Sequence, residues 1–141
     1  MIIKQLSVFL ENKSGRLSDV TKVLAQNDIN ISALSVADTS EYGILRLIVA
    51  QPEKAHEMLK DAGFSVSLTD VICLIIPHQA GTLFKAVEFL STSNVSIEYM
   101  YAYATGDNAS VIMKVSEVNV AIDTLIKNNF KLAKAREIYT K

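Results

Sequence analysis

Hydrophobic and polar residues alternate along the first ten positions of the chain. Leu6, Val8 and Leu10 fall on one face, and Gln5, Ser7 and Phe9 form a mixed face on the other side. This period of two is typical of a half-buried strand. After a short polar stretch, apolar residues recur at helical spacing from Leu17 to Leu24. The pattern therefore predicts a strand followed by an amphipathic helix.

The next forty residues predict two strands, a second helix and a fourth strand. Apolar runs at 29–37 and 42–50 are joined by a short polar link that suits a hairpin. Pro52 fits the first turn of a helix, and Gly63 is able to take the left-handed conformation after its end. Residues 64–68 then form the fourth strand.

The whole pattern repeats after 66 positions without a gap. The shift places like residues on one another: Gly15 on Gly81, Leu17 on Leu83, Leu24 on Leu90, Ile31 on Ile97, Leu59 on Leu125 and Phe64 on Phe130. The second copy predicts strands at 72–77, 95–104, 109–116 and 131–137 and helices at 81–93 and 118–128. Asn129 stands where the first copy has Gly63.

The order strand, helix, strand, strand, helix, strand is the split βαβ arrangement of the ferredoxin-like fold. We expect an α+β protein of two ferredoxin-like βαββαβ repeats packed together, with antiparallel sheets and helices on one face. The domains are expected at 1–70 and 71–141. Ile44 and Ile48 put apolar surface on the other face. The copies are expected to meet there, to meet along a sheet edge, or to meet another chain.

Charge and composition exclude several classes of partner. The 141 residues include 14 basic and 15 acidic ones, spread along the chain, for a net charge of −1. No electrostatic footprint for nucleic acid or an anionic membrane is present. No signal peptide or apolar span is evident, so a cytoplasmic location is expected. Cys73 is the single cysteine, which excludes an internal disulfide and predicts a buried thiol.

The loop before each first helix is the candidate ligand site. The amides near Gly15, Arg16 and Leu17 begin a helix and are expected to receive a carboxylate. Asn12 adds a side-chain amide that suits both ends of an amino acid, and Asn30 is expected beside this loop. The alternative stays open that the glycine only permits tight packing and that the polar residues only cap or turn.

Two segments of the first copy carry a resemblance to a known family. They are ENKSGRL at 11–17 and DINI at 28–31, and together they resemble the signature of the ACT domain, a small regulatory module attached to amino-acid-metabolism enzymes. Both halves resemble it over their full length. The resemblance implies that paired copies bind a free amino acid at their interface. It matches Asn12 and Asn30 to polar ligand contacts and Gly15 and Leu17 to backbone donors.

The second copy keeps the glycine and the leucine at the equivalent positions and replaces the two asparagines. The equivalent residues are His78, Gly81, Leu83 and Ser96. Both asparagines are thus missing, so this copy is expected either to bind differently or to serve as the wall of the first site. The proline that often precedes the family's loop glycine is also replaced, by Ser14 and Ala80.

These observations favour a non-catalytic sensor that binds a free amino acid. No nucleophile with a base, cofactor fingerprint or metal-ligand spacing is evident, so neither a metal nor a cofactor is expected. The alternative is a ligand-free interaction subunit that regulates an enzyme of amino-acid metabolism, and a homo-oligomer is also compatible. Tyr99, Tyr101 and Tyr103 share one strand face, where packing or an inter-domain role is favoured over a ligand site. An RNA-binding role is the third hypothesis, and the charge and the third strand disfavour it.

Overall fold

The computed structural model describes residues 1–11, 14–38 and 42–139, which form two compact units. The first-repeat unit comprises Lys4–Thr69 and Arg136–Lys141, and the second-repeat unit comprises Met1–Ile3 and Asp70–Ala135. Each unit therefore includes a short segment from the opposite end of the chain. The domain limits 1–70 and 71–141 follow the sequence repeat, not these compact units, and stay a prediction.

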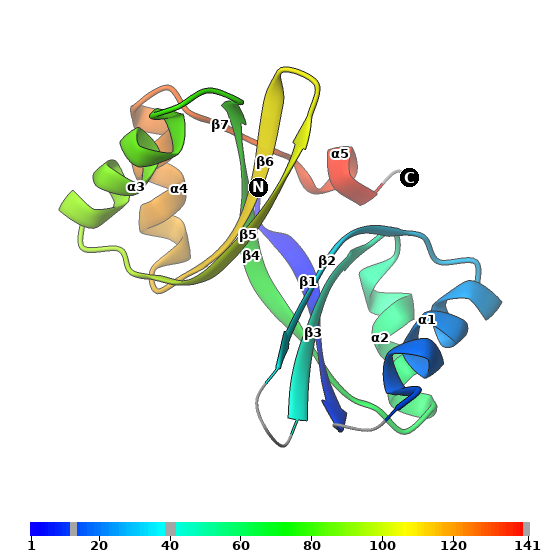
Figure 1. The fold of residues 1–141 in the computed structure, drawn as a ribbon. Coiled ribbons are helices and arrows are strands. Elements are labelled where there is room, and N and C mark those ends of the chain that lie inside the picture. Colours follow the sequence, from blue (N-terminus) through cyan, green and yellow to red (C-terminus); the bar gives the residue numbers. More distant parts are fainter. Residues whose placement is uncertain (12–13, 39–41, 140–141) are drawn as a thin grey trace. The chain divides into compact units, whose positions relative to one another are not determined.

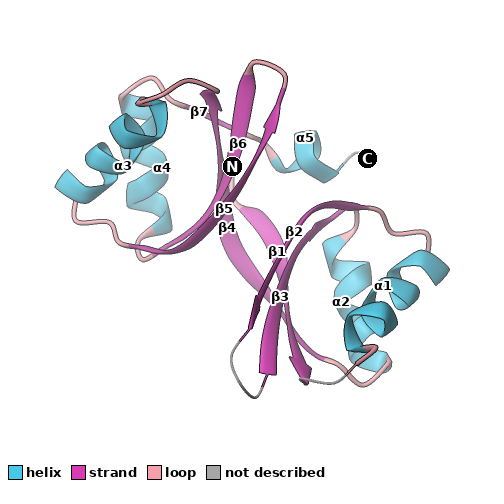
Figure 2. Cartoon of the chain, in the orientation of Figure 1, coloured by secondary structure: helices cyan, strands magenta, loops and turns pink. Residues whose placement is uncertain are grey.

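The first-repeat unit is an antiparallel sheet with two helices on one face (Figures 1 and 2). In chain order its elements are β1 (Ile3–Glu11), α1 (Arg16–Gln26), β2 (Ile31–Asp38), β3 (Tyr42–Val49), α2 (Pro52–Asp61) and the first part of β4 (Ser65–Pro77). The strands lie in the order β2-β3-β1-β4. Val8 of β1 pairs with Leu45 of β3. This arrangement confirms the ferredoxin-like prediction.

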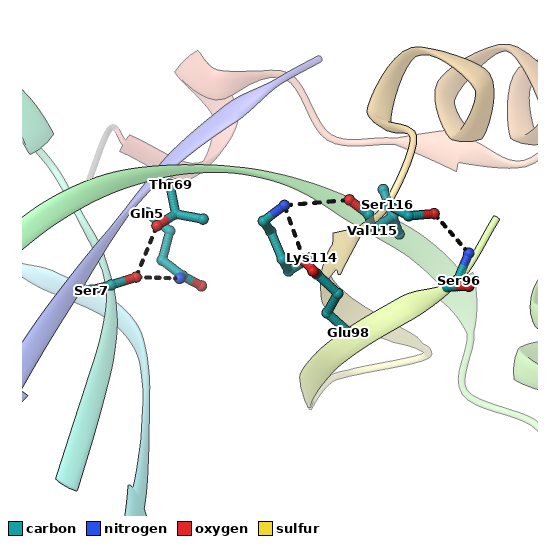
Figure 3. Close-up of polar contacts among 8 residues, drawn as sticks. All are labelled: Gln5, Ser7, Thr69, Ser96, Glu98, Lys114, Val115 and Ser116. Carbon is teal, nitrogen blue, oxygen red and sulfur yellow. Dashed lines mark hydrogen bonds and ion pairs between the residues drawn. The ribbon is translucent and has the colours of Figure 1, made fainter. Parts of the chain in front are cut away.

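The core of this unit lies between its sheet and its helices. Leu6, Val8 and Leu10 are buried there, as the alternation predicts. The opposite face of β1 carries Gln5, which is fully buried and donates from Nε2 to Ser7 Oγ at 3.1 Å. Ser7 Oγ and Thr69 Oγ1 share a further hydrogen bond of 3.0 Å (Figure 3). Side-chain hydrogen bonds thus compensate the burial of polar groups on that face.

The second-repeat unit repeats the arrangement. It combines the rest of β4 with α3 (Thr82–Thr92), β5 (Ile97–Thr105), β6 (Asn108–Val115), α4 (Val118–Lys127) and β7 (Lys131–Leu132). The strand order is β7-β4-β6-β5, so β5 forms one edge. Leu74, Leu90 and Leu125 are fully buried in its core.

The backbone preserves the duplication at three pairs of left-handed residues. Each pair is separated by 66 positions: Gly15 and Gly81 (φ 90° and 91°), Asp28 and Asn94 (55° and 58°), and Gly63 and Asn129 (93° and 65°). Only glycine and, less readily, asparagine or aspartate adopt this region without strain. The structure therefore confirms the internal repeat and the equivalence of Asn129 with Gly63.

Two expectations about strands are wrong. The strands at 64–68 and 72–77 are one continuous strand, β4, because residues 69–71 contain no glycine or proline to break it. Residues 131–137 form only the short β7 and then the helix α5 (Ala135–Tyr139). Alanine, lysine, arginine and glutamate dominate that stretch, and these residue types favour helix over strand.

The C-terminal helix α5 is held against the first repeat by hydrogen bonds. The Tyr139 hydroxyl accepts from the Lys4 backbone N–H and lies 3.2 Å from the Lys4 carbonyl oxygen, to which it donates. Ser32 Oγ donates to the Ile138 carbonyl oxygen at 3.0 Å. These contacts explain why residues after 135 belong to the first-repeat unit.

Burial and helix length settle two smaller points. Cys73 is fully buried, as predicted. Across residues 1–11, 14–38 and 42–139, none of the helices combines the length and the apolar character that a bilayer crossing requires.

Candidate functional site

Glycine begins the first helix of each repeat in the left-handed conformation. A Cβ added to Gly15 or Gly81 would meet nothing within 4 Å, so these glycines serve the backbone conformation and not tight packing. Within the described residues, no side chain caps α1 or α3 at its N-terminus, which removes Ser14 as a cap. The first-turn amides of both helices are thus not taken up by side-chain caps.

The loop before α3 is held in place by its own polar groups. The Thr82 hydroxyl donates to the carbonyl oxygens of Pro77 and Gln79, at 2.8 and 2.9 Å. The His78 backbone N–H donates to the Asp107 carbonyl oxygen at 2.8 Å. The second bond ties the loop to the turn between β5 and β6, which brings two segments distant in sequence together.

A cavity of about 300 Å³, here called the second-repeat cavity, opens between this loop and the hairpin. Its residues come from the end of β4, the start of α3 and the strands β5 and β6: Ile76, Pro77, His78, Gln79, Thr82, Leu83, Ala102, Tyr103, Ala104, Ala109 and Val111. The volume is at the lower end of the range for small-molecule sites. An amino acid is a ligand of suitable size.

Two of the expected second-repeat residues line this cavity, and a third adjoins it. His78 and Leu83 are among the lining residues, and Gly81 is the N-cap of α3. Ser96 lies elsewhere, after the C-terminal end of α3. Its N–H donates to Ser116 Oγ at 2.9 Å (Figure 3). Its carbonyl oxygen accepts from the Ser116 N–H, also at 2.9 Å.

The first-repeat residues divide in the same way. Asn12 lies outside the described residues. Gly15 is the N-cap of α1, whereas the Asn30 carbonyl oxygen accepts from the Ala50 N–H at 3.1 Å, after the other end of the helix. An α-helix of 11 residues is about 16 Å long, so the expectation that Asn30 lies beside the loop is wrong within one unit. A ligand that contacts both positions has to be held by two copies of the domain.

Arg16 and Leu17 present their side chains differently at the start of α1. The Arg16 guanidinium lies 4.4 Å from the centre of the Phe64 ring, a cation–π distance. Its Nη1 lies 3.4 Å from Asp19 Oδ2. Leu17 remains 43% exposed. The Arg16 side chain is thus engaged with its own unit, and the proposed role of residues 16 and 17 depends on their backbone amides.

The hairpin wall of the cavity was missed from sequence. The sequence places Tyr103 on an aromatic face for which packing is favoured, and the alanines of β5 have no feature that indicates a ligand site. Their position depends on the contact between the loop and the β5–β6 turn, which single-sequence patterns do not reveal. The one sequence feature that bears on the hairpin is the internal repeat, because it places the hairpins of the two copies at equivalent positions.

The site offers binding groups and no evident metal centre. In the parts of the chain that the structure describes, no three histidine, cysteine, aspartate or glutamate side chains gather as a metal site would require. Backbone amides at a helix start suit a carboxylate, and the apolar wall suits a side chain. The arrangement thus offers a partner to a carboxylate and a place for an apolar group.

Comparison with known proteins identifies one matching family. A family model described as "ACT domain pair" matches residues 1–140. No curated protein matches the chain.

Solved structures include one with high similarity over the whole chain. Protein BT0572 from Bacteroides thetaiotaomicron is 45% identical, with a TM-score of 0.96, and the match covers 100% of this chain and 98% of that one. The regulatory subunit of aspartate kinase from Thermus thermophilus is 16% identical (TM-score 0.67), with 91% and 94% covered. The corresponding subunit from Thermus flavus is 17% identical (TM-score 0.59), with 89% and 92% covered. The two Thermus proteins share the fold.

Proposed function

Since the chain belongs to the ACT domain pair family, we propose that it is a non-catalytic regulatory protein that binds a small free amino acid where ACT domains meet. The observation that carries the proposal is the second-repeat cavity, into which the uncapped start of α3 opens beside an apolar wall. The α3 amides receive the carboxylate, because a helix start carries partial positive charge. The side chain of the ligand enters the cavity.

The contribution of a second copy follows from the length of the first helices. The loop before the helix and the start of the next strand lie at opposite ends of an 11-residue helix in each unit. We propose that Gly15, Arg16 and Leu17, or Gly81 and Leu83 with His78, act from one copy. Asn30 or Ser96 then acts from another copy, and Asn12 is proposed to join the loop contacts.

Signalling in this proposal requires that the amino acid binds two arrangements of the domains with different affinity. A metabolite sensor with micromolar to millimolar affinity gains about 4 to 8 kcal/mol from its ligand. A few amide contacts and a partly buried side chain supply free energy of this size. The relatives described as regulatory subunits of aspartate kinase support an enzyme as the partner that receives the signal.

A thermal-shift screen of the full chain against the twenty amino acids tests the proposal. We expect one or a few of them to raise Tm, and calorimetry to give a Kd between about 1 μM and 1 mM. D-enantiomers of the same compounds serve as controls, because they present the same charges in the wrong geometry. A screen in which no amino acid raises Tm would remove the sensor function.

A ligand-free interaction subunit is the second candidate. Its support is the apolar surface on the edge strands, where Leu34 and Val36 of β2 and Met100 of β5 are 42–49% exposed. Exposed apolar groups on a strand edge favour association with another protein. This candidate predicts no response to any amino acid and co-purification with an enzyme whose activity changes on binding.

A further inference from the structure

Among the residues that the structure describes, no aspartate, glutamate, lysine or arginine side chain lines the second-repeat cavity. Four of its uncharged lining residues are Pro77, Gln79, Thr82 and Ala104. The rest of the lining is apolar apart from His78 and the hydroxyl of Tyr103. A ligand side chain that enters the cavity therefore meets mostly apolar groups and no carboxylate, ammonium or guanidinium group from the described residues.

The same four positions in the first copy carry charges. Counting back 66 residues gives Glu11, Lys13, Arg16 and Asp38. The two copies thus share backbone geometry at the helix start, with φ of 90° at Gly15 and 91° at Gly81, but differ in charge at every one of these positions. The two copies therefore differ in residue charge at four positions that line the second-repeat cavity.

We infer that the second-repeat cavity selects the side chain of the bound amino acid, and that it takes an uncharged apolar side chain of the size of leucine, isoleucine or phenylalanine. This inference rests on the proposed function and names the ligand class of the same site. The first-repeat copy is less suited to an apolar side chain, because its sequence carries charged residue types at the four equivalent positions.

Desolvation sets the direction of the preference. A charged ligand side chain placed against these walls loses hydration and gains no partner, which disfavours it by at least about 100-fold in Kd. Each methylene that the cavity buries improves Kd by about fourfold. L-Leucine and L-phenylalanine are therefore expected to bind more tightly than L-alanine or glycine, and much more tightly than L-lysine or L-aspartate.

Ala104→Asp tests the location of the site. It introduces the residue that the first copy carries at the equivalent position, and Ala104 is exposed at the cavity wall, so the fold accommodates the new side chain. Thr82→Arg is less suitable, because it removes the hydroxyl that holds the loop. Thr105→Asp is the matched control, since it adds the same charge one residue along β5, at a position that does not line the cavity.

Calorimetry on the full chain is carried out with L-leucine, L-phenylalanine, L-lysine and L-aspartate. We expect wild type to prefer the apolar pair by at least about 100-fold. Ala104→Asp should weaken the apolar pair at least about tenfold and reduce the preference for leucine over lysine, whereas Thr105→Asp should stay within about twofold.

Three outcomes overturn the inference in distinguishable ways. If the tightest ligand is charged, the ligand class is wrong while the sensor function stands. If an apolar amino acid binds and Ala104→Asp leaves its Kd unchanged, the second-repeat cavity is not the site. If no amino acid binds wild type at millimolar concentration, the proposed function itself fails and the inference fails with it.

Discussion

Replacement of Tyr139 by phenylalanine tests the attachment of the C-terminal helix to the first repeat. The Tyr139 hydroxyl makes two hydrogen bonds to the backbone of Lys4, one as acceptor and one as donor. Phenylalanine keeps the ring and its packing and removes both bonds. The substitution therefore isolates the polar part of the contact.

The expected loss follows from these two bonds. Each contributes about 0.5 to 1.5 kcal/mol net to stability, and partial exposure allows water to replace some of that. We expect the free energy of unfolding to fall by about 1 to 2 kcal/mol. For a chain of this size that corresponds to a decrease in Tm of about 3 to 8 °C.

Urea unfolding and hydrogen exchange measure the effect. Protection should fall at the amides of β1 and at the start of β2, where Ser32 bonds the Ile138 carbonyl. Tyr103→Phe is the matched control, because Tyr103 is 38% exposed and no hydrogen bond to its hydroxyl is found among the described residues. If both variants lose the same stability to within about 0.3 kcal/mol, the helix is not attached through Tyr139 in solution.

Three further predictions concern the repeat and its loop. Gly63→Asn should cost less stability than Gly63→Ala, which loses about 1 to 2 kcal/mol in urea unfolding, because Asn129 already occupies the equivalent left-handed position; equal losses would contradict the stated role of the conformation. Leu24→Ala and Leu90→Ala should each lose about 2 to 5 kcal/mol, since both side chains are at most 1% exposed. Hydrogen exchange should report the first loss in the first-repeat unit and the second in the other, and a loss below about 1 kcal/mol for either would refute its place in the core. Asn12→Ala should weaken amino-acid binding at least about tenfold by calorimetry, and an unchanged Kd would remove that side chain from the site.

Most of the fold was predictable because both repeats carry regular periodicity. Alternation in β1 placed Leu6, Val8 and Leu10 in the core, and the core contains them. The errors arose where the pattern was short. The predicted strands at 64–68 and 72–77 leave residues 69–71 between them, but a stretch without glycine or proline does not end a strand.

The candidate site was less predictable because it depends on contacts between distant segments. The helix starts at Gly15 and Gly81 could be found from local turn chemistry. The hairpin residues Tyr103 and Ala104 complete the cavity, and the bond from His78 to Asp107 ties the loop to that hairpin. The error over Asn30 has a similar cause. Asn30 is close to the loop in sequence, but helix α1 lies between them and places them at its two ends.

The paired left-handed residues limit how the gene can change. At Asp28 and Asn94, and at Gly63 and Asn129, most amino acids would add strain of about 1 to 2 kcal/mol. Few residue types are therefore tolerated at these positions, whereas many are tolerated at ordinary surface positions. Long after the side chains of two ancestral copies have lost their likeness, glycine, asparagine and aspartate recurring at a constant interval would still disclose the duplication.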